Sequence, residues 1–136
     1  MGKYLFVSVL ALHLLLAACG GDGVQGDPAR GEALYEQSNI GPNNAPGCIT
    51  CHSLEPGEVI VGPSHAGLAT RAGETVRDPG YTGEAETAEG YLRESIVSPN
   101  AYVEEGFAPN VMYQKFSEDL TDREIADLVA FMMTLK

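Results

Sequence analysis

Residues 48–52 read Cys48-Ile49-Thr50-Cys51-His52, and this stretch decides how the rest of the chain is interpreted. Two thiols three positions apart lie on the same side of a helical turn. From there they can add to the two vinyl groups of one haem, and the imidazole of the next residue can reach the iron. Cys-x-x-Cys-His is the attachment sequence of c-type haem. The stretch therefore predicts one covalent haem c, bound through Cys48 and Cys51, with His52 as an iron ligand.

The cysteine pair on its own also allows three other uses. A zinc site needs four ligands, and the histidines outside the motif are His13, in the N-terminal apolar run, and His65. A thioredoxin-like redox pair needs a strand–helix–strand frame, for which the sequence shows no pattern. A structural disulfide would leave His52 without a use. Haem attachment is preferred because it accounts for all three residues of the motif.

A haem iron of this kind usually has a second axial ligand from the protein. The candidates are Met112, Met132, Met133 and His65. Met132 belongs to the apolar stripe of the last expected helix and Met133 is its neighbour, so both are expected to pack in the core. His65 follows His52 closely and is expected on the same side of the ring. Met112 lies in a loop that can reach the opposite face, so Met112 is the preferred ligand.

Composition limits the classes of protein that the chain can belong to. It has 136 residues, which is at most one domain. The 16 glycines and 8 prolines predict much loop and turn structure. The net charge is −11, with 8 basic residues against 19 acidic ones. Nucleic-acid binding needs clustered cations, so nucleic acid is excluded as an expected partner.

Residues 1–18 have the character of a secretory signal peptide, with Lys3 before an apolar run. The run is shorter than the about 20 residues of a membrane-spanning helix. It ends in Leu16-Ala17-Ala18-Cys19, which is similar to the lipobox of bacterial lipoproteins. We expect cleavage before Cys19 and lipidation of that cysteine, with residues 19–26 as a lipidated, flexible tether. An ordinary signal peptide with an unmodified cysteine is the alternative.

Helix signals appear in three places. Asp27 can cap a helix that begins with Pro28 and runs to about Gln37. A second helix is expected over residues 88–97. Thr121-Asp122-Arg123-Glu124 is a capping box, and apolar residues recur at helical spacing after it. These signals predict an all-α domain with long loops.

These features resemble class I, single-haem cytochromes c, over residues 27–136. The haem motif matches at Cys48, Cys51 and His52, and the first expected helix carries the family's glycine and aromatic at Gly31 and Tyr35. The resemblance implies a small cytochrome c fold in which three to five short helices and long loops surround one covalent haem. It also implies a close crossing of the first and last helices at Gly31.

The segment 62–71 is similar to the family's stretch after the haem motif. The resemblance implies that the carbonyl of Pro63 accepts a hydrogen bond from His52, which orients the ring. It implies that Arg71 pairs with a haem propionate, although a solvated surface charge is equally consistent. The family's axial methionine is typically followed by proline, whereas here Tyr113 follows Met112.

Residues 89–102 are similar to the haem domains fused to oxidase subunit II and to the single-haem lipoprotein subunit of alternative complex III. This narrower resemblance implies a role in a respiratory or photosynthetic chain. Two protein ligands would leave the iron no open position for a substrate, so we expect an electron carrier rather than an enzyme. Its expected partners are other redox subunits or complexes, containing haem or copper, with no small-molecule substrate at the iron. Its expected location is the periplasmic face of the cell membrane, reached by the lipid anchor. An accessory haem subunit of a periplasmic, for example sulfur-oxidising, enzyme is the alternative.

Overall fold

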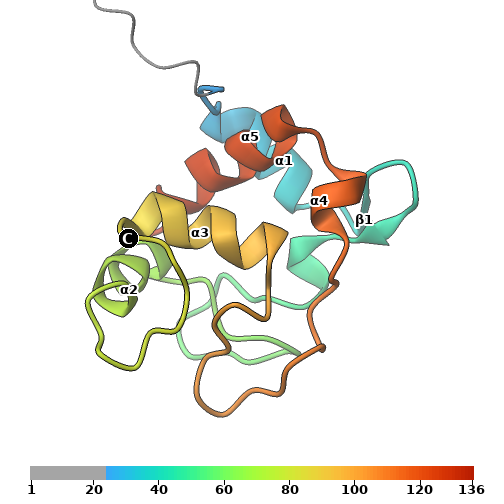
Figure 1. The fold of residues 1–136 in the computed structure, drawn as a ribbon. Coiled ribbons are helices and arrows are strands. Elements are labelled where there is room, and N and C mark those ends of the chain that lie inside the picture. The colour runs from blue at the N-terminus through green and yellow to red at the C-terminus, as the bar shows by residue number, and fades with distance from the viewer. Residues whose placement is uncertain (1–23) are drawn as a thin grey trace, which may run out of the picture.

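The computed structural model describes residues 24–136. The expected signal peptide, the lipidation site Cys19 and the start of the tether lie outside these described residues. The elements in chain order are α1 (Pro28–Tyr35), β1 (Asn39–Ile40), β2 (Ala45–Pro46), the 3-10 turn η1 (Cys48–Thr50), α2 (Leu68–Thr75), α3 (Ala88–Val97), α4 (Phe116–Asp119) and α5 (Asp122–Met132). The all-α prediction is confirmed, since the sheet consists of two antiparallel two-residue strands (Figure 1).

Helix α1 lies against α5 at the top of the molecule (Figure 1). Its start is the predicted one, because the Asp27 side chain accepts a hydrogen bond from Arg30 N at 3.0 Å and Pro28 occupies the first turn. It ends at Tyr35, slightly before the predicted Gln37. A Cβ on Gly31 would come 1.9 Å from the carbonyl oxygen of Asp127, so the two helices cross at backbone contact.

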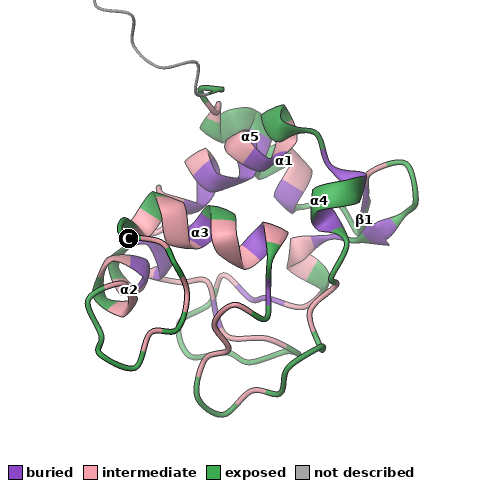
Figure 2. Ribbon diagram, in the orientation of Figure 1, coloured by how far each residue is buried: buried purple, intermediate pink, exposed green. Residues whose placement is uncertain are grey.

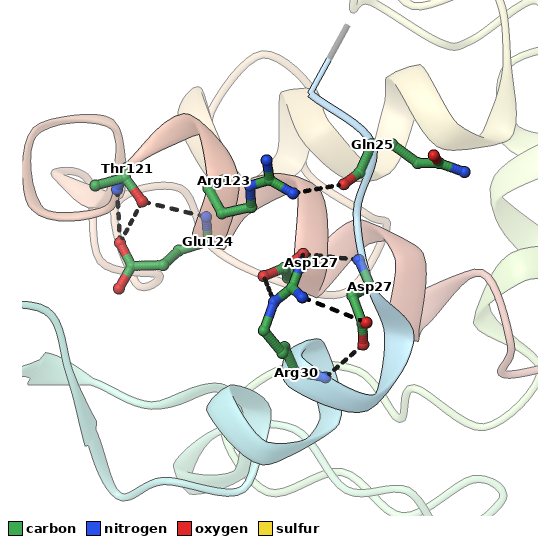
Figure 3. A network of polar contacts seen from close by, with 7 residues as sticks. All are labelled: Gln25, Asp27, Arg30, Thr121, Arg123, Glu124 and Asp127. Atoms are coloured by element: carbon green, nitrogen blue, oxygen red, sulfur yellow. Dashed lines mark hydrogen bonds and ion pairs between the residues drawn. The ribbon is translucent and has the colours of Figure 1, made fainter.

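A polar network joins the same two helices (Figure 3). The buried carboxylate of Asp127 accepts hydrogen bonds from Arg30 Nε at 2.8 Å and from Asp27 N at 2.7 Å. The hydrogen bonds from Arg30 hold the pKa of Asp127 below its usual range. Arg123 donates to the carbonyl of Gln25 at 3.1 Å. The chain is thus attached to α5 from Gln25 onward, although this residue was expected to belong to the tether.

Helix α5 begins with the predicted capping box (Figure 3). Thr121 Oγ1 accepts from Glu124 N at 3.2 Å, and the Glu124 carboxylate accepts from Thr121 N at 2.8 Å. The apolar face of the helix is buried at Ile125, Leu128 and Met132, as its spacing predicts. This face forms the centre of the hydrophobic core, and Figure 2 shows the buried residues on the facing sides of the helices.

Helices α2 and α3 pack on each other, and α3 packs on α5. Helix α3 matches the prediction, with Thr87 Oγ1 accepting from Gly90 N at 3.0 Å as its cap. Helices α2 and α4 were not predicted. Gly67 precedes α2 in the left-handed conformation, with φ of 67°, and offers no capping side chain. No helix within residues 24–136 has the length and apolar character needed to cross a membrane.

Candidate functional site

The haem motif folds as the turn η1 and the residues that follow it. Cys51 N and His52 N both donate to the carbonyl of Cys48, at 3.1 and 3.0 Å. Thr50 Oγ1 donates to the carbonyl of Gly47 at 2.6 Å, which fixes the start of the turn. The backbone therefore holds the two thiols and the imidazole in one short, well-bonded turn.

Cys48 and Cys51 are free thiols and both are half-buried. Burial raises the pKa of the Cys48 thiol to about 11, which is the opposite of the lowered pKa of a redox-active cysteine pair. Within residues 24–136, no group of three or more His, Cys, Asp and Glu side chains is arranged to hold a metal ion. Among the described residues, this donor set does not supply the four ligands of a zinc site.

One cavity of about 330 Å³ lies beside the motif. This is within the roughly 300–1,000 Å³ typical of cofactor pockets. Its walls are predominantly apolar and come from η1, from α2 and α3, from the loop before α4, and from α5. Every predicted site residue of the domain lines this cavity: Cys48, Cys51, His52, Pro63, Arg71 and Met112.

The imidazole of His52 is buried, with 9% of the residue exposed. Its Nδ1 lies 2.9 Å from the carbonyl oxygen of Pro63, so Nδ1–H is the donor and Nε2 carries the free lone pair. Burial lowers the pKa of His52, and the bond to Pro63 opposes this only in part. A neutral imidazole with one free nitrogen is the form that binds a metal.

Gly62 and His65 both lie against the His52 ring. A Cβ on Gly62 would come 2.4 Å from His52 Cε1, so only glycine allows the chain to pass here. The His65 ring stacks on the His52 ring, with centroids 3.9 Å apart and an angle of 20° between the planes. His65 therefore lies on the His52 side, as expected, and is not a ligand for the opposite face. Burial, followed by the charges of His52 and Arg71, holds the pKa of His65 well below its usual range.

Arg71 is half-buried on α2 and its guanidinium donates to the carbonyls of Ser64 and Ala66. These bonds hold the loop that presents the Pro63 carbonyl to His52. Arg71 thus bonds to the residues before and after His65 while it also lines the cavity. The sequence suggested a propionate partner or a solvated charge; it carried no sign of this contact with the loop.

The loop that carries Met112 is held by polar contacts of Asn100. Asn100 Nδ2 donates to Asn110 Oδ1 and to Gln114 Oε1, both at 2.8 Å, and Asn100 Oδ1 accepts from Asn110 N at 2.9 Å. Gln114 Nε2 donates to the carbonyl of Met112 at 2.7 Å. Tyr113, in place of the usual proline, donates from its hydroxyl to Asp119 at 2.6 Å. No pattern in the sequence pointed to these bracing side chains, because their pairing depends on how the loop folds back on itself and follows no helix or strand spacing.

Met112, Met132 and Met133 differ in how they lie relative to the cavity and the core. Met112, in the loop, and Met132, on α5, both line the cavity, and Met133 lies next to the core. Met132 is 4% exposed and packs with Leu128 and Ile125 in the core. Met112 is only half-buried, so its thioether contributes less to core packing than the buried side chain of Met132.

The residues fit a haem: two free thiols, a neutral imidazole and a thioether meet at one apolar cavity. The family model described as "Cytochrome c" matches residues 28–136. No curated protein matches the chain. The family match covers most of the chain and includes the complete haem-attachment motif. This chain therefore belongs to the cytochrome c family, whose members carry covalently bound haem c and transfer electrons.

Proposed function

We propose that this chain is a single-haem electron carrier with His52 and Met112 as axial ligands, tethered to a membrane and serving a quinol-oxidising or oxidase complex. The observation that carries the proposal is the cavity at which Cys48, Cys51, His52 and Met112 meet. The free Nε2 of His52 and the bond of its Nδ1 to Pro63 support its role as a ligand.

A bound haem supplies one-electron chemistry, and His–Met ligation of its iron raises the reduction potential. The chain's own residues attach it, exclude water and orient the ligands. Two protein ligands leave no open position for a substrate, which supports electron transfer rather than catalysis at the iron.

The haem assignment is tested on the purified, denatured chain. The colour and the haem-dependent peroxidase stain should stay with the polypeptide on a denaturing gel. Haem should also resist extraction by acidic acetone. The double variant Cys48→Ser, Cys51→Ser is the control and should lose the stain. Extraction of the haem from the unaltered chain would show that it is not covalently bound.

The membrane tether rests on the lipobox-like sequence at Cys19 and on where the fold begins. Residues from Gln25 onward contact α5, so only a short segment separates the proposed lipid from the domain. The variant Cys19→Ser should lose incorporated lipid label and release the protein from the membrane fraction. Retention of the label in this variant would contradict the lipobox interpretation.

The choice between a fixed subunit and a mobile carrier depends on association with other proteins. A subunit of a quinol-oxidising or oxidase complex should stay with its neighbours after extraction in a mild detergent. A mobile carrier should separate from them under the same conditions. Recovery together with a sulfur-oxidising enzyme would instead favour the accessory-subunit alternative.

A further inference from the structure

The plane of the His52 ring is controlled by more than its hydrogen bond. The bond to the Pro63 carbonyl fixes the direction of Nδ1–H but leaves the ring free to rotate about that direction. The parallel His65 ring, 3.9 Å away between centroids, covers one face of the imidazole. Gly62 closes on the same ring at Cε1. These contacts together restrict the rotation of the imidazole.

His65 is itself held on two sides. Its Nδ1 lies 3.0 Å from Tyr35 Oη, and its backbone N donates to the carbonyl of Ser53 at 2.8 Å. Tyr35 has no exposed surface, and its hydroxyl oxygen lies 3.4 Å from the carbonyl oxygen of His52. The Tyr35 ring packs against Phe131 of α5, with centroids 5.2 Å apart. The position of His65 is thus tied to the crossing of α1 and α5.

We propose that His65 is a positioning residue: its ring, anchored by Tyr35, sets the plane of the His52 imidazole and thereby the electronic state of the iron that His52 binds. This inference rests on the proposed role of His52 as an axial ligand. Where two flat rings stack, as His65 and His52 do, the plane of one restricts the plane of the other, which a branched aliphatic side chain of similar size does not do. An imidazole combines that flat surface with a ring nitrogen for the Tyr35 hydroxyl. Residues that orient a metal-bound histidine tune both its orientation and its basicity.

The test compares His65→Leu, His65→Phe and Tyr35→Phe, each first checked for covalent haem. The readouts are the g-values of the ferric iron in electron paramagnetic resonance and the paramagnetic NMR shifts of the haem methyl groups. Both depend on the orientation of the axial imidazole plane, and neither measures electron-transfer activity. Thr70→Ala, an exposed change near the same loop, is the matched control.

His65→Leu should change both the g-values and the NMR shifts of the haem methyl groups. His65→Phe should keep both close to their values in the unaltered protein, and Thr70→Ala should leave them unchanged. Tyr35→Phe keeps the packing ring and removes the hydroxyl that holds His65, so it should give a smaller shift. If His65→Leu does not acquire haem, the g-values and NMR shifts of Tyr35→Phe test whether the anchored His65 ring orients His52.

Unchanged g-values and NMR shifts in His65→Leu would overturn the inference. If His65→Leu does not carry haem, the same result in Tyr35→Phe would overturn it. Equal shifts in His65→Leu and His65→Phe would also overturn it, since stacking would then not be the cause. Failure of the underlying function would look different: the unaltered chain would lack covalent haem or the spectrum of a histidine-ligated iron.

Discussion

A methyl group on Gly31 would come within 1.9 Å of the backbone carbonyl oxygen of Asp127. This closeness of α1 and α5 has a consequence at the haem cavity. Tyr35, one turn after Gly31, reaches from α1 to His65, while Met132 of α5 lines the cavity wall. The crossing of the two helices therefore sets the relative positions of groups on both sides of the site.

The first prediction concerns this crossing. Gly31→Ala should destabilise the fold by about 1–3 kcal/mol, because the new methyl group meets a backbone atom that cannot turn aside. Gly73→Ala in α2 is the matched control, since its Cβ would lie 3.9 Å from the nearest atom. It should be neutral or stabilising by up to about 1 kcal/mol. Denaturant unfolding of the haem-loaded proteins measures both, and equal stability of the two variants would contradict the close crossing.

The second prediction concerns pH. The pKa of Asp127 is lowered in the folded chain, first by the hydrogen bonds from Arg30. Its carboxylate therefore adds stability above the unfolded pKa of about 3.9, and this stability is lost as the pH falls through the folded pKa. Asp127→Asn should be less stable at pH 7 and should show a smaller fall in stability below about pH 4.

Asp122→Asn is the control for this measurement. Asp122 is on the same helix and pairs with Arg93 at 2.7 Å, but its side chain is 74% exposed. An exposed ion pair contributes little to the free energy of unfolding. This variant should therefore show the same dependence of stability on pH as the parent, measured by denaturant unfolding from pH 7 to pH 2. Parallel curves for Asp127→Asn and the parent would contradict the assigned role of Asp127.

The third prediction separates the two methionines at the cavity. Met112→Ala should open the sixth position of the iron to carbon monoxide or cyanide and lower the reduction potential. Met132→Ala should keep the original spectrum and cost about 2–5 kcal/mol of stability, because its side chain is buried in the core. Ligand-binding spectra and redox titration distinguish the two. The reverse pattern would move the axial ligand to α5.

The fourth prediction concerns the bracing of the Met112 loop. Asn100→Ala removes three hydrogen bonds, each worth about 0.5–1.5 kcal/mol. The variant should release its methionine ligand at a lower denaturant concentration than the parent, seen as loss of the methionine–iron charge-transfer band. Gln37→Ala, which removes one exposed hydrogen bond to Ala33 on the α1 side, should not change that midpoint. An unchanged midpoint in Asn100→Ala would show that other contacts hold the loop.

The fifth prediction concerns docking. The chain has a net charge of −11, and Glu84, Glu86 and Glu89 are exposed around the start of α3. Charge steering toward a basic partner is screened within about 8 Å at physiological salt. Electron-transfer rates should therefore fall as ionic strength rises. Changing the three glutamates to Gln should flatten that dependence and leave the haem spectrum unchanged. Glu104 is unsuitable for this test because it lines the cavity.

A salt dependence that is flat in the unaltered protein would contradict steering. It would leave the acidic surface with a role in solubility and would favour a carrier that stays docked on its partner.

Features with local causes could be predicted from the order of the residues alone. The Cys-x-x-Cys-His turn needs only consecutive residues, and the structure forms it with bonds to the Cys48 carbonyl. The starts of α1, α3 and α5 likewise follow from caps formed by nearby residues. A cap is satisfied within one turn of its helix, so its residues can be read without knowledge of the fold.

Other features depend on partners that come together only when the chain folds. Helix α2 has no capping side chain, and Ala69 N donates instead to the carbonyl of Leu135 at the end of the chain. The ring of His65 acquires its place from Tyr35 on α1, and the Met112 loop is braced from Asn100. The physical reason is the same in each case: a buried or strained group is satisfied by whichever partner the fold brings near, and that partner leaves no local pattern.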